Sequence, residues 1–275
     1  MTAAALALCG HAPALAQDAK PPSCGGATIA RGTVTRVLDG RSFKLGDGRE
    51  VRLAGIEVPS PEPARTADAP PSGAQAALDE RAKAALDALV GGDEVVLRSA
   101  EIAADRYGRL VGYAYAVRDG DEIFGQGELI AAGLARVADN AGGRTCAADL
   151  LEREAAARAA KLGLWADPYY DVLDAASLAD IRARQGRFAL VAGKVVTVRE
   201  SGSTIYVNFG RRWSQDFAVT VRKRNERSFA TAGVDLKALS GRRVLVRGWI
   251  EARGDEHGPW MEAVHPEQIE AAGLQ

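Results

Sequence analysis

The stretch from Val34 to Pro59, VTRVLDGRSFKLGDGREVRLAGIEVP, constrains the fold of this chain more than any other part of the sequence. Apolar and polar residues alternate in three short segments, residues 33–38, 42–45 and 50–56. The connections are Asp39-Gly40 and Gly46-Asp47-Gly48, and glycine is the residue that tight hairpin turns favour where φ is positive. The sequence therefore predicts a curled antiparallel meander of three strands, with polar residues gathered near the strand ends.

Helices and further strands are expected after the meander. Counted from the first strand of the meander, the order of elements is β-β-β-α-β-β-α-α. Residues 58–73 carry five prolines, which neither a helix nor a central strand accommodates, so this segment is expected to be a loop. Residues 74–90 have apolar side chains at helical spacing, and Gly91-Gly92 ends the pattern. The other elements expected before residue 166 are strands at 94–98 and 110–117, joined by the turn Asp105–Arg109, and helices at 122–132 and 147–161.

Five motifs occur in a fixed order within residues 27–165: LDGRSFKL, VRLAGIEVP, DRYGRLVGYAY, GELIAAGLARV and GLW. In these motifs and their order the chain resembles the staphylococcal nuclease family, also called thermonuclease-like. The resemblance implies a mainly β fold with helices, of the α+β class, built on a five-stranded Greek-key barrel of the oligonucleotide-binding (OB) type. It also implies calcium-dependent hydrolysis of phosphodiester bonds in DNA or RNA.

The same resemblance places the family's functional positions on this chain. The position of the first calcium-binding aspartate falls on Arg41, two residues after Asp39, and that of the second falls on Glu57. The two catalytic arginines fall on Arg52 and Arg109. Calcium needs oxygen ligands, and Arg41 puts a permanent positive charge where one of them is expected.

The position of the general base falls on Ser60, which cannot take a proton at neutral pH without a neighbouring base. Glu62 could replace it only if the loop is bulged. No histidine is near in the sequence, because the three histidines are His11, His257 and His265.

We interpret Arg52, Glu57 and Arg109 as catalytic positions that have lost their activity, in a pseudoenzyme without metal or other cofactor. Arg41 and Glu57 are expected to form an ion pair in place of the metal. Three arginines and one carboxylate then leave about two positive charges, so Arg41, Arg52 and Arg109 are expected to bind phosphate. Two alternatives stay open: a divergent active nuclease that uses calcium, and a turn at Asp105–Arg109 that is only a solvated hairpin.

Charge and patterning separate the second half of the chain from the first. The whole chain has 35 Lys and Arg against 36 Asp and Glu, which excludes a uniformly basic nucleic-acid coat protein. Residues 1–186 carry 21 basic and 26 acidic side chains, a net −5, whereas residues 187–275 carry 14 and 10, a net +4. The second half is therefore the better candidate for contact with a polyanion through its electrostatic field.

The second half reads as a second small OB-like β-barrel over residues 187–275, after a linker at 166–186. Strands are expected at 187–199, 204–209, 217–221, 243–252 and 260–264, with a helix at 225–232. Aromatic residues alternate here with basic ones, a composition that suits base stacking but also ordinary barrel packing. The aromatic residues are Tyr206, Phe209, Trp213, Phe217 and Trp249, and the basic ones are Arg211, Arg212, Arg222, Lys223 and Arg224.

The N-terminus indicates export. Residues 1–16 lack Lys, Arg, Asp and Glu and end in Ala-Leu-Ala, which is typical of a signal peptide cut before Gln17, and a lipoprotein at Cys9 is the weaker alternative. No later segment has 18 consecutive apolar residues, so no transmembrane span is expected. Export leaves Cys24 and Cys146, for which we expect a disulfide, with two free buried thiols as the alternative.

The sequence thus predicts a periplasmic or secreted two-domain protein that binds phosphate, single-stranded nucleic acid or another polyanion. An interaction protein with partners in the cell envelope, using the Pro-rich loop 58–73, remains open as a further class.

Overall fold

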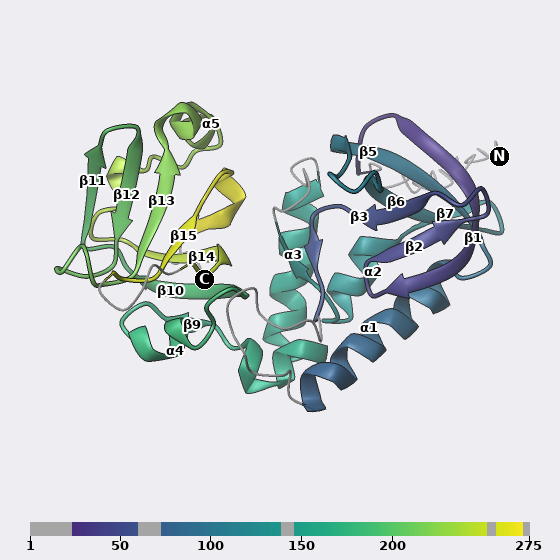
Figure 1. The fold of residues 1–275 in the computed structure, drawn as a ribbon, viewed down its shortest axis with the longest axis horizontal. Coiled ribbons are helices and arrows are strands. Elements are labelled where there is room, and N and C mark those ends of the chain that lie inside the picture. Colours follow the sequence, from purple (N-terminus) through teal and green to yellow (C-terminus); the bar gives the residue numbers. More distant parts are fainter. Residues whose placement is uncertain (1–23, 60–72, 139–145, 252–256, 272–275) are drawn as a thin grey trace, which may run out of the picture.

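The computed structural model describes residues 24–59, 73–138, 146–251 and 257–271. The chain is a mixed α+β protein with two β-rich lobes (Figure 1). One lobe contains β1–β7 with α1, α2 and α3, and the other contains β10–β15 with α5. Within these ranges no helix is both long and apolar enough to cross a membrane.

The predicted meander forms the centre of the first lobe. β1 (Thr28–Asp39), β2 (Ser42–Leu45) and β3 (Glu50–Leu53) pair as successive antiparallel strands. β5 (Glu94–Ala104) pairs with β1 and with β6 (Leu110–Arg118), and β3 also pairs with β6 in parallel. The ring β1-β2-β3-β6-β5 is therefore closed, as expected for the five-stranded barrel. Register shifts in β1 bend the strand. The bend allows one part of β1 to pair with β5 and the other part to pair with β2.

Helix α1 (Gly73–Val90) packs against this barrel, close to the range predicted for it. Its buried side chains Leu78, Ala82, Leu86 and Val90 recur every fourth residue, so they share one helix face. Ala82 approaches the β1–β2 turn so closely that a Cβ added to Gly40 would lie 2.8 Å from the Ala82 Cβ. Gly40 is thus needed for the approach of the helix as well as for the turn.

Two further helices complete the first lobe, and one boundary differs from the prediction. α2 (Gly125–Ala131) begins later than expected, because residues 122–124 belong to β7 (Asp121–Phe124), which pairs with β6. The connection is the two-residue turn Asp119-Gly120, with φ of 52° and 87°, a hairpin signal that precedes the misassigned residues. α3 (Ala147–Ala159) follows, close to the range predicted for it, and the short pair β4 (Ile56–Glu57) and β8 (Arg136–Val137) was not predicted.

The second lobe consists of two four-stranded sheets with the orders β16-β14-β10-β9 and β11-β12-β13-β15. The strand expected at 187–199 is divided between them into β10 (Phe188–Lys194) and β11 (Thr197–Ser201). The other strands are β9 (Leu173–Asp174), β12 (Thr204–Asn208), β13 (Ala218–Arg222), β14 (Arg243–Trp249), β15 (Trp260–Glu262) and β16 (Ile269–Ala271). The helices are α4 (Leu178–Arg182) and α5 (Glu226–Thr231), with short 3-10 turns at Gly163–Ala166, Pro168–Tyr170, Lys223–Asn225, Lys237–Leu239 and Pro266–Gln268.

The segment 166–186, expected as a linker, is folded. It contributes α4 and β9, and β9 pairs in parallel with β10 of the second lobe. An apolar cluster also joins the lobes, in which Leu164 and Trp165 pack with Phe188, Leu190 and Leu245. The two halves therefore bury apolar surface against each other.

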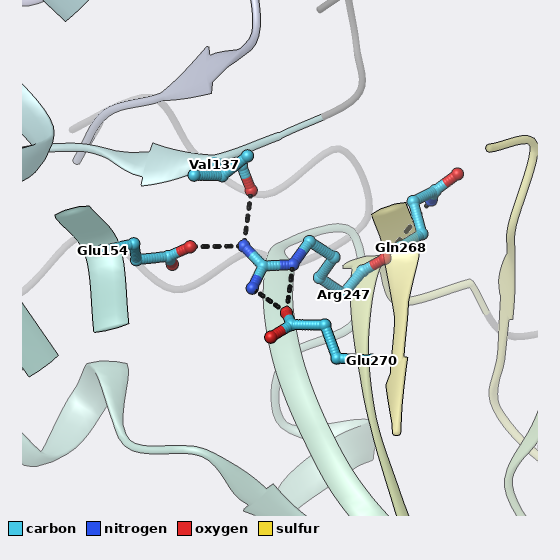
Figure 2. A network of polar contacts seen from close by, with 5 residues as sticks. All are labelled: Val137, Glu154, Arg247, Gln268 and Glu270. Carbon is cyan, nitrogen blue, oxygen red and sulfur yellow. Dashed lines mark hydrogen bonds and ion pairs between the residues drawn. The ribbon is translucent and has the colours of Figure 1, made fainter. Parts of the chain in front are cut away.

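A buried arginine adds polar contacts to this interface (Figure 2). Arg247 of β14 donates through Nη1 to the Val137 carbonyl, at 3.1 Å, and to the carboxylate of Glu154 in α3. Its Nε and Nη2 donate to Oε1 of Glu270. Burial disfavours the charged guanidinium, but the two carboxylates outweigh that effect and raise the pKa of Arg247.

The structure does not contain the expected disulfide, because Cys24 and Cys146 are free thiols. The two thiols nevertheless lie together and interact through a hydrogen bond. Burial raises the pKa of both thiols, and disulfide formation requires the thiolate. The free pair corresponds to the alternative of two free buried thiols in part, because Cys146 is buried and Cys24 is partly exposed.

Candidate functional site

The expected ion pair between Arg41 and Glu57 is present. Nη1 of Arg41 donates to Oε2 of Glu57, and the two side chains are only 13% and 5% exposed. Glu57 is the last residue of β4, where it lies opposite Arg136 of β8. The unpredicted β4–β8 pair is thus the element that holds this carboxylate in place.

The β1–β2 turn fixes the backbone of Arg41. Its N–H donates to Oδ1 of Asp39 at 2.8 Å, and its carbonyl accepts from the N–H of Leu53 at 2.8 Å. The first bond is the Asx-turn contact expected for Asp-Gly chemistry. Asp39 therefore contributes to the site by shaping the turn from which Arg41 projects.

Arg52 lies in β3, between Ser42 of β2 and Val111 of β6. Its pKa is lowered, first by burial and then by the positive charges of Arg41 and Arg109. Glu57 and Asp39 offset part of this effect. The structure thus brings the three arginines and Glu57 within electrostatic reach of one another, and a bound anion would relieve their repulsion. In the described ranges Arg52 forms no ion pair with a carboxylate.

Arg109 has a carboxylate partner that the sequence analysis did not assign. Nε and Nη2 of Arg109 each lie 2.7 Å from Oδ2 of Asp105, across the β5–β6 hairpin. Burial disfavours ionisation of Asp105, but hydrogen bonds from the Arg109 side chain and backbone outweigh it and hold the pKa of Asp105 below its usual range. The expectation of about two unpaired positive charges is therefore too high, since Asp105 neutralises one.

The turn Asp105–Arg109 also presents an exposed aromatic ring. The Tyr107 ring centroid lies 5.2 Å from the guanidinium carbon of Arg109 and 5.1 Å from that of Arg106. Such distances are those of cation–π contacts. The exposed ring and the two guanidinium groups therefore lie together at the tip of the hairpin.

A second acidic neighbour comes from α1. Burial and the nearby charge of Asp39 raise the pKa of Asp79, and Arg41 offsets only part of that rise. No local sequence signal marks Asp79, because its proximity depends on α1 packing over the β1–β2 turn. Its negative charge further reduces the positive potential at Arg41.

The described residues do not fit the calcium ion that the resemblance implies. Glu57 is engaged by Arg41, whose guanidinium occupies a position where an oxygen ligand is needed. In the part of the chain that the structure describes, no group of three or more His, Cys, Asp or Glu side chains is arranged to hold a metal. Ser60 and Glu62, the two candidates for the base position, lie outside the described residues.

The aromatic and basic residues singled out in the second lobe divide into two groups. Phe209 and Phe217 are buried and pack against each other, and Trp249 packs against Phe188. Tyr206 and Trp213 are exposed. Among the basic residues, Arg222 pairs with Glu262, Lys223 with Glu200 and Arg212 with Asp216. Much of the pattern is therefore core packing and surface ion pairs.

Comparison with known families gives one match in the first lobe. Residues 50–167 match the family described as Staphylococcal nuclease homologue. The match covers Arg52, Glu57 and Arg109 and begins after Arg41. No curated protein matches the chain.

Proposed function

Since residues 50–167 belong to the staphylococcal nuclease homologue family, we propose that this chain is an exported member that binds nucleic-acid phosphates without hydrolysing them. The binding site is formed by Arg41, Arg52 and Arg109 of the first lobe. It works without calcium and without a general base.

The ion pair between Arg41 and Glu57 is the observation that carries this proposal. In a calcium-dependent phosphodiesterase that carboxylate would ligate the ion, which neutralises the phosphoryl oxygens and activates water. Here the same carboxylate is neutralised by a guanidinium from its own chain. The water-activating part of the chemistry has therefore lost its ligand, whereas the groups that contact phosphate remain.

The state of Arg52 supports phosphate as the ligand. Its guanidinium is partly buried beside two other cations, and the lowered pKa reports the cost of holding it there. Guanidinium groups bind phosphate oxygens through paired N–H donors, and charge-assisted bonds of this kind are about twice as strong as neutral ones. Binding of a phosphate group would compensate the repulsion among the arginines.

Two further parts of the proposal concern the rest of the chain. Residues 1–16 direct export, which their uncharged apolar run and Ala-Leu-Ala end support. Residues 187–275 make a second OB-like barrel, which three pairings support. These are the antiparallel pair β10–β14, the parallel pair β13–β15 and the bridge between Glu251 and Trp260.

The test compares binding and digestion on the chain beginning at Gln17. Anisotropy of a labelled single-stranded oligonucleotide should show the same affinity in calcium and in chelator, and gels should show no digestion in either. Arg52→Ala should weaken binding about tenfold, the loss of one charge-assisted contact of about 1.4 kcal/mol.

The matched control is Arg31→Ala, which removes the same charge from β1. Arg31 is an exposed residue paired with Glu94, and it lies eight residues before Asp39, roughly 25 Å along a strand. Equal losses from both substitutions would show only a general charge effect. Digestion that is faster with calcium than with chelator would instead support the divergent active nuclease and overturn the proposal.

A further inference from the structure

The outer face of the sheet β11-β12-β13-β15 carries aromatic and basic side chains that are not part of the phosphate site in the first lobe. In β12 and β13 the residues Ile205, Val207, Val219 and Val221 point inward and are buried. Residues between them face the other way. The register places Arg199, Tyr206, Thr220 and Glu262 in one row across the four strands, and Glu262 at the end of the row pairs with Arg222. Tyr206 is therefore an aromatic side chain in the middle of a solvent-facing sheet surface.

A second aromatic ring lies beside this row. Trp213, in the connection between β12 and β13, is 64% exposed, and its ring centroid is 5.6 Å from the guanidinium carbon of Arg199. Arg199 thus neighbours Tyr206 through strand pairing and Trp213 through a cation–π contact. The three side chains form one continuous group, which we call the aromatic face.

The loop that carries Trp213 is held by several bonds. The N–H of Arg212 donates to Oδ2 of Asp216 at 2.8 Å, and the Arg212 guanidinium donates to Oδ1 at 3.2 Å. The N–H of Gly258 donates to the Ser214 carbonyl at 2.8 Å. A Cβ added to Gly210 would lie 2.0 Å from Asp216 Oδ2, so only glycine fits there. The backbone that carries Trp213 is therefore held in place, which reduces the entropy lost on binding.

The charge on the aromatic face is positive. Glu200, next to Arg199 in β11, is held by Lys223 and Lys237 instead. Neither ion pairs nor hydrogen bonds link Arg199 to a carboxylate among the described residues. Residues 187–275 also carry a net charge of +4, from 14 basic and 10 acidic side chains. The face therefore suits an anionic ligand with planar groups.

We propose that Arg199, Tyr206 and Trp213 form a binding site for single-stranded nucleic acid, in which unpaired bases stack on the two rings and Arg199 contacts the backbone. Every base offers a π face, so such stacking needs no particular sequence. Bases within a duplex are covered by their neighbours, so the site selects single strands. The inference is independent of the phosphate site in the first lobe, because it uses other residues and another interaction.

Two measurements on the chain from Gln17 test the site: quenching of tryptophan fluorescence by an oligo(dT) strand where Trp213 is present, and anisotropy of a labelled oligo(dT) strand for the variants of Trp213. Trp213→Ala should weaken binding about tenfold, since stacking contributes strongly for each base. Trp213→Phe should keep most of the affinity, because the ring is retained. An abasic strand of equal length has the same phosphates, and its weaker binding should be insensitive to Trp213→Ala.

Arg243→Ala is the matched charge control for Arg199→Ala, because Arg243 is exposed on β14 in the other sheet. Arg199→Ala should weaken oligo(dT) binding several-fold more than Arg243→Ala. Unchanged affinity in Trp213→Ala, or equal losses for the abasic strand, would overturn the proposal. Quenching by a neutral oligosaccharide but not by oligo(dT) would also overturn it, in favour of a glycan site.

The proposal for the aromatic face and the proposal for the first-lobe site can be disproved separately. In Arg52→Ala the quenching by oligo(dT) that depends on Trp213 should persist. Its disappearance in that variant would show that the two sites are one, and would contradict the independence argued above.

Discussion

Arg41 and Glu57 are 16 residues apart in the sequence, and their side chains meet in an almost buried ion pair between the first turn of the barrel and β4. Removing one partner of a buried pair loses the attraction that offsets the desolvation of the other charge, which costs about 3 kcal/mol. Arg41→Ala should therefore lower the free energy of unfolding by about that amount in urea titrations.

The double substitution Arg41→Met with Glu57→Leu should recover most of this loss, because apolar replacements of a buried pair are often neutral or better. Lys44→Ala is the control, since Lys44 and Glu50 form an exposed pair on the same meander, 41% and 37% exposed. Such pairs contribute about 0–1 kcal/mol. A similar cost for Arg41→Ala and Lys44→Ala would contradict the structural role of the Arg41–Glu57 pair.

Asp79 should destabilise the folded chain at neutral pH. Its pKa is raised on folding by burial and by Asp39, so the folded state binds this proton more tightly than the unfolded state does. The penalty is present when the pH is above the folded pKa and vanishes below the unfolded value, near 3.9. Asp79→Asn should thus raise the free energy of unfolding at pH 7, and the gain should disappear by about pH 3. A gain that is independent of pH would show a packing effect instead.

Asp105 should show the opposite pH dependence. The pKa of its carboxyl is lowered on folding, so it stabilises the native state above its unfolded pKa, near 3.9, and this contribution is lost as the pH falls through the folded value. Asp105→Asn should cost about 1 kcal/mol at pH 7, as for a partly exposed ion pair. The difference from the natural chain should shrink at lower pH, and a constant difference between pH 7 and pH 2 would contradict this account.

The sequence predicts the parts of the site that depend on neighbouring residues. The turn Asp39-Gly40, the meander and the positions Arg41, Arg52, Glu57 and Arg109 follow from alternation, turn chemistry and the family motifs. β4 and β8 contain two residues each, too few for alternation to be recognised. The role of Asp79 depends on how α1 packs, which no local pattern encodes.

Asp105 is a different case, because a signal for its pairing with Arg109 was present. The two residues are four apart across a tight turn, and an aspartate at the first position of a turn commonly accepts from the backbone two residues on, as Asp105 does from Tyr107 at 2.9 Å. In the second lobe, the aromatic and basic pattern mixed core residues with surface residues. Strand pairing was needed to separate Phe217, which is buried, from Tyr206, which is exposed.

Arg247 should couple the two lobes. Its side chain is 3% exposed and joins Glu154 of the first lobe to Glu270 of the second. Arg247→Ala should cost about 3–5 kcal/mol, because it leaves the buried Glu154 uncompensated. Arg222→Ala is the control, since Arg222 and Glu262 form an exposed pair within the second lobe and should cost under about 1 kcal/mol.

Calorimetry distinguishes coupling from local packing in the Arg247→Ala chain. If Arg247 holds the lobes together, the variant should unfold in two transitions where the natural chain unfolds in one. A single transition at lower temperature would show that the apolar contacts of Leu164, Trp165 and Phe188 are sufficient for coupling.

Arg41→Asp should create a calcium site that the natural chain lacks. The substitution removes the ion pair between Arg41 and Glu57 and adds a carboxylate beside Glu57, so two hard oxygen donors replace a cation. A ligand that binds only the folded state stabilises it, by about 1.4 kcal/mol if 10 mM calcium meets a Kd of about 1 mM. The melting temperature of Arg41→Asp should then rise with calcium, whereas that of the natural chain should not.

Arg41→Ala is the control for removing the ion pair alone, and it should give a smaller rise because it supplies one carboxylate fewer. Adding Ser60→Glu, which restores the family's base position, should make any digestion of single-stranded DNA depend on calcium. Equal rises of the melting temperature with calcium in the natural chain and in Arg41→Asp would show that Arg41 does not displace the metal. The interpretation of the site as one that binds phosphate without calcium would then fail.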